Sequence, residues 1–140
     1  MATIGENIRT VLVADSTGVN ALVSGRVHQN SVPESLTMPR VWYTRASSFE
    51  DMDNGGIGGL TDSSWDIECH AEDLDVALNL ATAVKTLLNG KSGDFGSTAD
   101  ADQVQGIFVE DHDDDYLPKG LGENDDNHIH VAAISAQILH

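Results

Sequence analysis

The chain has 140 residues, with 23 acidic side chains against seven lysines and arginines, and its formal net charge is −16. This length is typical of one domain with one hydrophobic core, so we expect a single domain over residues 1–140. The acidic surplus repels phosphate, which argues against a general nucleic-acid clamp. Cys69 is the one cysteine, which excludes an internal disulfide, and no apolar run reaches the roughly 20 residues of a membrane span. The first residues lack a charged-then-apolar signal sequence, and we expect a soluble protein made in a cytoplasm, with no membrane partner.

The pattern in the first third of the chain predicts a helix followed by extended segments. Apolar residues at three- and four-residue steps predict a helix over Thr3–Asp15, with a stripe that consists of Ile4, Ile8, Val11 and Leu12. A further short turn of helix is predicted before Gly25, and an extended segment after it. β-Branched and aromatic residues then predict a strand over Val41–Ser47.

The best-defined unit runs from Ser63 to Gly90 and consists of a strand, a corner and a helix. In the strand, Ser63–His70, the apolar side chains Trp65, Ile67 and Cys69 alternate with the polar side chains Ser64, Asp66, Glu68 and His70. This alternation predicts a half-buried strand with one wet face, and a buried, inert Cys69 thiol. We expect this strand to pair with Val41–Ser47 through a long, glycine-rich loop over Ser48–Thr61.

After Ala71 the apolar period changes to that of a helix. The stripe consists of Leu74, Ala77, Leu78, Ala81, Val84, Leu87 and Leu88, and Asn89-Gly90 is a suitable left-handed stop. The helix is therefore predicted to pack on the sheet. The residues expected at that contact are Trp65, Ile67, Leu78, Ala81 and Val84.

The C-terminal third reads as two strands separated by an acidic loop. The predicted segments are a flexible connection over Lys91–Asp102, a strand over Gln103–Asp111, an acidic loop over Asp111–Asn127 and a closing strand over His128–Leu139. The apolar phase changes within the closing strand, since Ile129 and Val131 share one face whereas Ile134 and Ile138 share the other. Two explanations are open. A bulge near Ala132-Ala133 changes the register, or other elements cover both faces of the second half of the strand.

Taken in order, these elements predict an α+β fold. We expect a mainly antiparallel four-stranded sheet packed on two helices, in the order α-β-β-α-β-β. Such a sheet has a second face that turns outward or toward a channel. Asp66 and Glu68 are predicted to lie on that face.

A metal site is the main enzymatic interpretation. Carboxylates and imidazoles are suitable metal ligands, and they occur together in Asp111-His112-Asp113-Asp114-Asp115, His128 and His130. A solvated acidic loop is the competing interpretation. It is favoured because runs of charged residues are usually no more than solvated surface. The segment Asp51–Gly55 resembles the start of a calcium loop but has no Glu at the twelfth position. We therefore expect no cofactor and no enzyme, while a divalent-metal-dependent enzyme and a small acidic binding module stay open as alternatives.

Several segments together resemble the tail-completion (tail-terminator) proteins of long-tailed bacteriophages. The resemblance covers nearly the whole chain, and the segments that carry it are Val19–Val27, Ser31-Val32-Pro33, Met38–Tyr43, Gly58-Gly59-Leu60, Trp65–Ala71 and the helix Leu74–Asn89. Their order and spacing carry the likeness more than any one motif does. The acidic loop Asp111–Asn127 and the alanine-rich final strand depart from the family pattern.

This resemblance implies a structural role in the virion. Proteins of this family assemble as a ring, commonly a hexamer, that caps the tail tube protein and joins it to the head–tail connector or stopper protein. DNA passes through the lumen of the ring without specific binding. The location implied for this chain is the head–tail junction of the virion.

Two groups of residues are expected to serve that assembly. Asp66 and Glu68 are predicted to face the lumen, where carboxylates repel DNA phosphates. The two long loops are predicted to contact neighbouring copies and to become ordered only in the assembly. The residues singled out in these loops are Asn54, Gly55, Gly58, Gly59, Asp113, Asp114, Asp115 and Tyr116.

Overall fold

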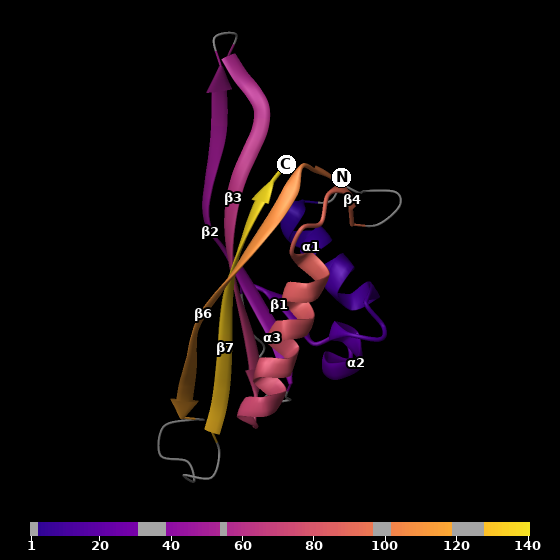
Figure 1. Cartoon of the computed structure of the whole chain (residues 1–140), viewed down its shortest axis with the longest axis vertical. Helices are drawn as coiled ribbons and strands as arrows, with labels where there is room; N and C mark the ends of the chain where they lie inside the picture. The colour runs from indigo at the N-terminus through magenta and orange to yellow at the C-terminus, as the bar shows by residue number, and fades with distance from the viewer. Residues whose placement is uncertain (1–2, 31–38, 54–55, 97–101, 119–127) are drawn as a thin grey trace.

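A five-stranded sheet with the strand order β1-β2-β3-β7-β6 forms the centre of the fold (Figure 1). The computed structural model describes residues 3–30, 39–53, 56–96, 102–118 and 128–140. The strands are β1 (Val27–Gln29), β2 (Arg40–Asp53), β3 (Gly56–Ala71), β6 (Gly106–Pro118) and β7 (His128–Leu139). β1 runs parallel to β2, and the other neighbours are antiparallel. The predicted α+β class and mainly antiparallel sheet are confirmed, but the predicted four strands omit β1, whose three residues are too few to show an alternation.

Three helices lie on one side of this sheet (Figure 1). They are α1 (Ile4–Ala14), α2 (Val19–Val23) and α3 (Leu74–Leu88). A capping box starts α1, because the Thr3 hydroxyl accepts from the Glu6 N–H and the Glu6 carboxylate accepts from the Thr3 N–H. Gly90, with a φ of 80°, follows α3 as predicted. The helices were predicted at these positions, although α2 adds a third helix to the predicted two.

The main core forms where α3 packs on β3 and β7. Trp65, Ile67, Ala81 and Val84 are buried there, as predicted. Leu78 was predicted at this contact, but its side chain is 36% exposed. Leu80 is fully buried in its place. The error arises because two neighbouring stripes on α3 share the helical period, and the sequence does not tell which of them faces the sheet.

The buried stripe of α3 combines large and small residues. It consists of Ala77, Leu80, Ala81, Val84 and Leu88. The two alanines are buried against the sheet, whereas Leu74 and Leu78, on the neighbouring stripe, are exposed.

The Cys69 thiol is buried, which confirms the prediction. The side chain is fully buried and the cysteine is free. Burial, with a smaller effect from the charge of Glu68, raises the pKa of the thiol to about 12. The thiol therefore stays protonated and unreactive at neutral pH.

The change of apolar phase in β7 does not come from a bulge in that strand. β7 pairs with β3 without interruption from His130 to Leu139. The irregularity lies in the neighbouring β6, between Asp111 and Asp114. The residues of β7 buried toward the helices are Ala132, Ile134, Ala136 and Ile138. Val131 is also buried, on the opposite face, so the phase changes because the two halves of β7 bury residues on different sides.

The predicted connection after α3 contains regular structure. β4 (Gly93–Phe95) pairs with β5 (Asp102–Val104) in a separate two-stranded sheet. Phe95 is fully buried and Val104 is nearly so, which attaches this small sheet to the core. The strand predicted over Gln103–Asp111 is consequently divided at Gln105 into β5 and β6.

The described residues of both predicted long loops lie in strands. Within Ser48–Thr61, β2 and β3 remain paired up to Asp53 and Gly56. Within Asp111–Asn127, β6 continues to Pro118. Glycine and aspartate disfavour strands intrinsically, but pairing with an adjacent strand outweighs that preference. Residues 54–55 and 119–127 lie outside the described part of the chain.

Candidate assembly surfaces

The β2–β3 hairpin extends well beyond the body of the molecule (Figure 1). Toward the arm, the pairing of β3 with β7 ends at Asp62. The preceding residue, Thr61, exchanges backbone hydrogen bonds with His140. Beyond this point the hairpin has two strands, formed by residues 49–53 and 56–60, which we call the arm. A two-stranded arm gains little stability by itself, because no third strand covers it within the described chain.

The predicted assembly residues fall on strands or outside the described chain. Gly58 and Gly59 lie in β3, within the arm. Asp113, Asp114, Asp115 and Tyr116 lie in β6, so the expectation that they belong to a loop was wrong. Asn54 and Gly55 lie outside the described residues.

The sheet has one face that is free of the three helices, which we call the open face. Its described side chains include Trp42, Thr44, Ser64, Asp66, Glu68, His70, Phe108, Glu110, Val131, Ser135 and Gln137. Asp66 is exposed and Glu68 is half-buried. The structure therefore places both predicted acidic residues on the face opposite α3.

A polar network on the open face links β2 and β3. Arg40 Nε donates to His70 Nδ1 at 3.2 Å, and His70 Nε2 lies 3.0 Å from Glu68 Oε1. Because Nδ1 accepts, the imidazole carries its proton on Nε2 and donates it to the carboxylate. Arg40 is 8% exposed and His70 is 6% exposed, so this part of the face is not wet as predicted. The network covers Val131, which is paired with His70 on β7.

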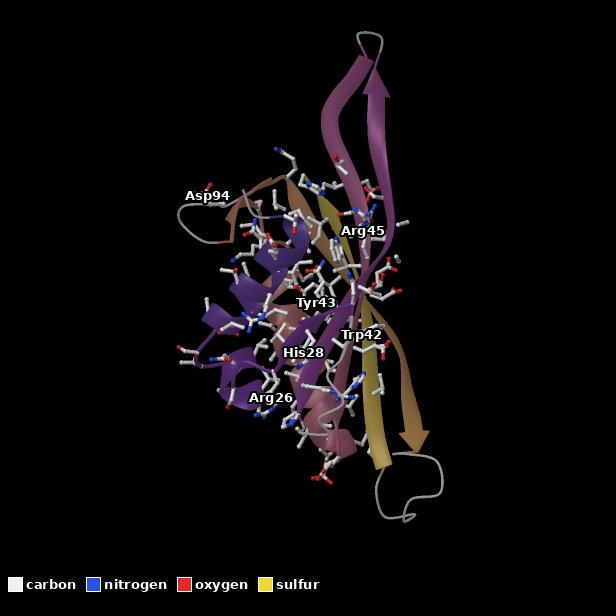
Figure 2. The ribbon with its side chains drawn as sticks, turned by 180° about the vertical axis from the view of Figure 1, so that it is seen from behind. Arg26, His28, Trp42, Tyr43, Arg45 and Asp94 are labelled. Atoms are coloured by element: carbon white, nitrogen blue, oxygen red, sulfur yellow. The ribbon has the colours of Figure 1, made fainter. Side chains whose placement is uncertain are left out.

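His28 lies next to this network. It is paired with Trp42 across β1 and β2, and Figure 2 shows the two residues on neighbouring strands. Burial, followed by the charges of Arg40 and Arg9, lowers the pKa of His28. Burial also lowers the pKa of Arg40. The open face therefore carries cationic and acidic groups together, which the acidic composition did not predict.

A cavity of about 550 Å³ lies where β1 ends. Its lining consists of Thr3, Ile4, Gly5, Gln29, Asn30, Arg45, Ser48, Thr61, Ser63, Trp65 and His140. Two buried hydrogen bonds hold the lining residues Gly5, Ser63 and Trp65. The Tyr43 hydroxyl donates to the Gly5 carbonyl, and Trp65 Nε1 donates to Ser63 Oγ at 3.0 Å. Burial raises the pKa of Tyr43 to about 12, so its hydroxyl remains a donor.

Asn30 ends the pairing of β1 with β2 beside this cavity. Asn30 has a φ of 66°, which a strand does not accommodate, and its N–H bonds the Tyr43 carbonyl. Its own carbonyl and side chain accept from Trp42 Nε1 and Thr44 Oγ1. Beyond Tyr43, no described residue pairs with the outer edge of β2.

The opposite edge of the sheet is covered over half its length. Gly90 N–H bonds the Ile107 carbonyl at 2.8 Å, and Val109 N–H bonds Asn89 Oδ1 at 3.1 Å. The end of α3 therefore occupies the outer edge of β6 at these positions. From Asp111 to Pro118, β6 pairs with β7 alone among the described elements.

Two exposed side chains stand out on these edges. Arg45 is exposed and makes no hydrogen bond or ion pair within the described chain. Figure 2 shows it near the point where the arm leaves the body. Phe108, at 54% exposed, is the most exposed large apolar side chain of the described part. Neither residue was predicted as a site residue. Both stand at strand positions, and local periodicity predicts a side chain's face but not whether a neighbouring element covers it.

The metal interpretation gains no support from the described residues. They contain no group of three or more His, Cys, Asp or Glu that could hold an ion. Of the candidate ligands, His130 has a described side chain, whereas those of residues 111–115 and His128 are outside the description. No helix of the described chain is long and apolar enough to cross a membrane.

Comparison with known proteins identifies a shared fold. No family model and no curated protein matches the sequence. A chain in the solved virion of a native gene transfer agent (GTA) particle is similar in structure, with a TM-score of 0.63. The similarity covers 95% of this chain and 92% of that chain, at 16% sequence identity. At this identity the likeness establishes the fold.

Proposed function

We propose that the protein is a structural component of a phage-like particle. The observation that carries this proposal is the fold that it shares with a virion chain of a gene transfer agent over nearly the full length of both chains. The segments that resemble tail-completion proteins support the same role independently of the fold. The proposal assigns no enzymatic activity to the chain.

We further propose that this component completes the tail. It forms a ring of six copies on the end of the tail tube and joins that tube to the head connector or stopper. The long arm supports this assignment, because it projects from the body and lacks a third strand within the described chain. An element of that kind is stabilised by a neighbour in an assembly.

DNA passes through this ring without specific binding in our proposal. Asp66 and Glu68 line the lumen and repel the phosphates. Their position on the open face supports this role, because a face covered by helices could not border a channel. The formal net charge of −16 per chain acts in the same direction.

Imaging of particles assembled with this protein tests the role. We expect a ring at the junction of head and tail, with sixfold symmetry and one protein layer. Particles that lack the protein should contain heads and tails that do not join. A map with one copy per junction, or with the protein elsewhere in the particle, would refute the tail-completion assignment.

A further inference from the structure

We infer that the cavity beside Arg45 receives the arm of a neighbouring copy, and that Arg45 binds an acidic side chain of that arm. The partner is a second copy of this chain, and the contact joins the arm of one copy to the body of the next. The inference rests on the proposed ring, and it names the site that receives the arm.

The cavity lies on the helix side of the sheet, between the base of the arm and the start of α1. Residues directly opposite on paired strands share one face of a sheet, and Arg45 and Ser48 are paired with the buried Trp65 and Ser63. Residues 3–5 also line the cavity. Its volume of about 550 Å³ is that of an ordinary ligand pocket, so it can hold part of another chain.

The lining of this cavity contrasts with the acidic composition of the chain. None of the described side chains that line it is an aspartate or a glutamate, and Arg45 is the one among them that is permanently charged. The whole chain has 23 acidic side chains against seven lysines and arginines. A cavity of this composition favours an anionic occupant.

Arg45 is available to bind such an occupant, whereas the other arginines of the chain are engaged. Arg9 and Arg26 donate to backbone carbonyls, and Arg40 donates to His70. Arg45 is exposed and has no hydrogen bond or ion pair within the described chain, and Figure 2 shows it where the arm leaves the body. A guanidinium presents a planar fork of N–H donors that matches a carboxylate in shape and charge. Arg45 can therefore bind a carboxylate from another chain.

The arm carries the complementary charge. Its described residues, 49–53 and 56–60, include Glu50, Asp51 and Asp53 and no lysine or arginine. Asp53 is about 25 Å from Arg45 of the same copy, because eight residues of extended strand separate the two positions. The arm therefore cannot place its acidic end in its own cavity, and it presents that end to another copy.

Charge argues against other surfaces of the chain as the receiver of the arm. The open face carries Asp66 and Glu110 as exposed side chains, and these acids would repel the acids of the arm. Lys91 lines a second cavity of about 350 Å³, but Asp15 and Asp94 line that cavity with it. The cavity beside Arg45 is thus the better match for an acidic arm.

The reach of the arm fits a closed ring. In a ring of six copies, equivalent points of neighbouring copies are separated by the distance from either point to the axis. An arm that spans about 25 Å, from its own base to the cavity of the next copy, places Arg45 about 25 Å from the axis. The arm and the cavity are different surfaces, so the contact is head to tail and repeats until the ring closes.

Cysteine cross-linking tests the contact directly. Asp53→Cys is combined in turn with Ser48→Cys and with Gln29→Cys, which lie in the lining of the cavity. Within one copy, five residues of extended strand, about 16 Å, separate Ser48 from Asp53, which is beyond the reach of a disulfide. Cys69 is fully buried and provides a silent background. In rings or particles, we expect at least one pair to give a ladder of covalent oligomers longer than dimers, because a head-to-tail contact repeats around the ring.

Matched variants make the cross-link specific. Asp53→Cys with Thr86→Cys places the second thiol on the exposed side of α3, outside the cavity, and we expect no ladder from it. A ladder from this pair and none from the cavity pairs would overturn the inference. Each single-cysteine variant should remain uncross-linked. A covalent dimer of Asp53→Cys alone would show that two arms meet, and would also overturn it.

Charge reversal gives a second readout. Arg45→Glu should weaken assembly about tenfold, because it places like charges together across the contact. Its urea denaturation should match that of the parent chain, since Arg45 is exposed, and this separates a loss of assembly from a loss of the fold. Adding Asp51→Lys or Asp53→Lys should restore assembly in at least one case. Lys91→Glu makes the same change of charge outside the cavity and should assemble like the parent chain.

Native mass spectrometry of the purified protein and imaging of particles measure assembly, and their outcomes separate this inference from the proposed function. Rings that form equally well with Arg45→Glu, or that give no cross-link from either cavity pair, would overturn the inference and leave the ring standing. A loss of assembly that neither lysine variant restores would assign Arg45 to another partner and would also overturn it. If the parent chain forms no ring in solution or in particles, the proposed function fails together with the inference.

Discussion

At the scale of single residues, α3 shows how small residues decide which side of a helix is buried. Ala77 and Ala81 are buried against the sheet, and the large side chain buried next to them is Leu80 rather than Leu78. Two adjacent apolar stripes differ by a rotation of the helix, and the better-packed one faces the core. The hydrophobic period predicted the helix and its amphipathic character, and packing then determined the rotation.

Leu80→Ala and Leu78→Ala should therefore differ in stability. Leu80 is fully buried, so its truncation should lower the free energy of unfolding by about 2–5 kcal/mol. Leu78 is 36% exposed, and its truncation should cost about 1 kcal/mol or less. Urea denaturation of both variants measures the difference. Equal losses would show that α3 presents a different face to the sheet.

His28 should make stability depend on pH. Burial, then the charges of Arg40 and Arg9, lowers its pKa below the ordinary value of 6.5. As the pH falls through 6.5, the unfolded chain binds a proton that the folded chain resists. The stability that neutral His28 contributes is therefore present above pH 6.5 and is lost as the pH falls toward the folded-state pKa.

Replacing His28 should remove this part of the pH dependence. The unfolding free energy of His28→Gln should fall less than that of the parent chain between about pH 7.5 and about pH 5.5. Chemical denaturation at both pH values measures it. His130→Gln is the control, since it removes another histidine of the described sheet. An unchanged slope for His28→Gln would rule out this linkage.

At the scale of elements, local pattern predicted what a single segment contains. α1 and α3 were predicted with nearly their observed bounds, because each has a clear helical period. β7 was predicted with its observed bounds, although its apolar phase changes along the strand. The arm and the second half of β6 were predicted as loops. Glycines and aspartates dominate there, and the strands form because partners supply hydrogen bonds that no local pattern encodes.

The candidate assembly surfaces were also predicted only in part, because local pattern does not encode which strands become partners. The alternation of apolar and polar residues in the strand correctly predicted that Asp66 and Glu68 lie on the open face. The pairing of β2 with β3 was predicted and is confirmed, but the register that brings Arg40 to His70, 30 positions away, is not encoded by either segment alone. Likewise, the covering of Ile107 by Gly90 follows from the packing of α3 rather than from the sequence of β6.

Shortening the arm should separate folding from assembly. Residues 51–60 can be replaced by Asn-Gly, since Glu50 and Thr61 are paired and a two-residue turn can join them. The shortened chain should keep its fold and unfold within about 1 kcal/mol of the parent chain, because the arm lacks a third strand. Its rings should be fewer or absent in native mass spectrometry, and particles should join heads to tails less often. If the shortened chain joined heads to tails as often as the parent chain does, the arm would not be one of the assembly surfaces.

At the scale of the whole molecule, the open face holds its two predicted acidic residues in different surroundings. Asp66 is exposed, whereas Glu68 is engaged with His70. The two acidic residues are thus not equivalent. Asp66 can be changed without loss of a contact, while a change at Glu68 also disturbs the Arg40–His70 network.

Asp66→Lys is accordingly the clean test of a phosphate-repelling lumen. The variant should unfold within about 0.5 kcal/mol of the parent chain, because the side chain is exposed. In rings it should create a salt-dependent affinity for DNA or slow the passage of DNA. Glu68→Lys should lower stability more, since it places a cation beside Arg40. Rings of Asp66→Lys that handle DNA like the parent would place this residue away from the DNA path.

The helices all lie on one side of the sheet (Figure 1), and this asymmetry limits how copies of the chain can surround a pore in the ring that we propose. If the open face borders the lumen, the helical layer lies on the outside, where the circumference is larger. The inner wall would then be a single sheet of backbone. If six copies contributed four strands each, β2, β3, β7 and β6, at a spacing of about 4.8 Å and a tilt of about 40°, they would enclose a circle about 48 Å across between backbones. In that arrangement one copy more or fewer would change the bore by about 8 Å, so the bore of an imaged ring would report the number of subunits.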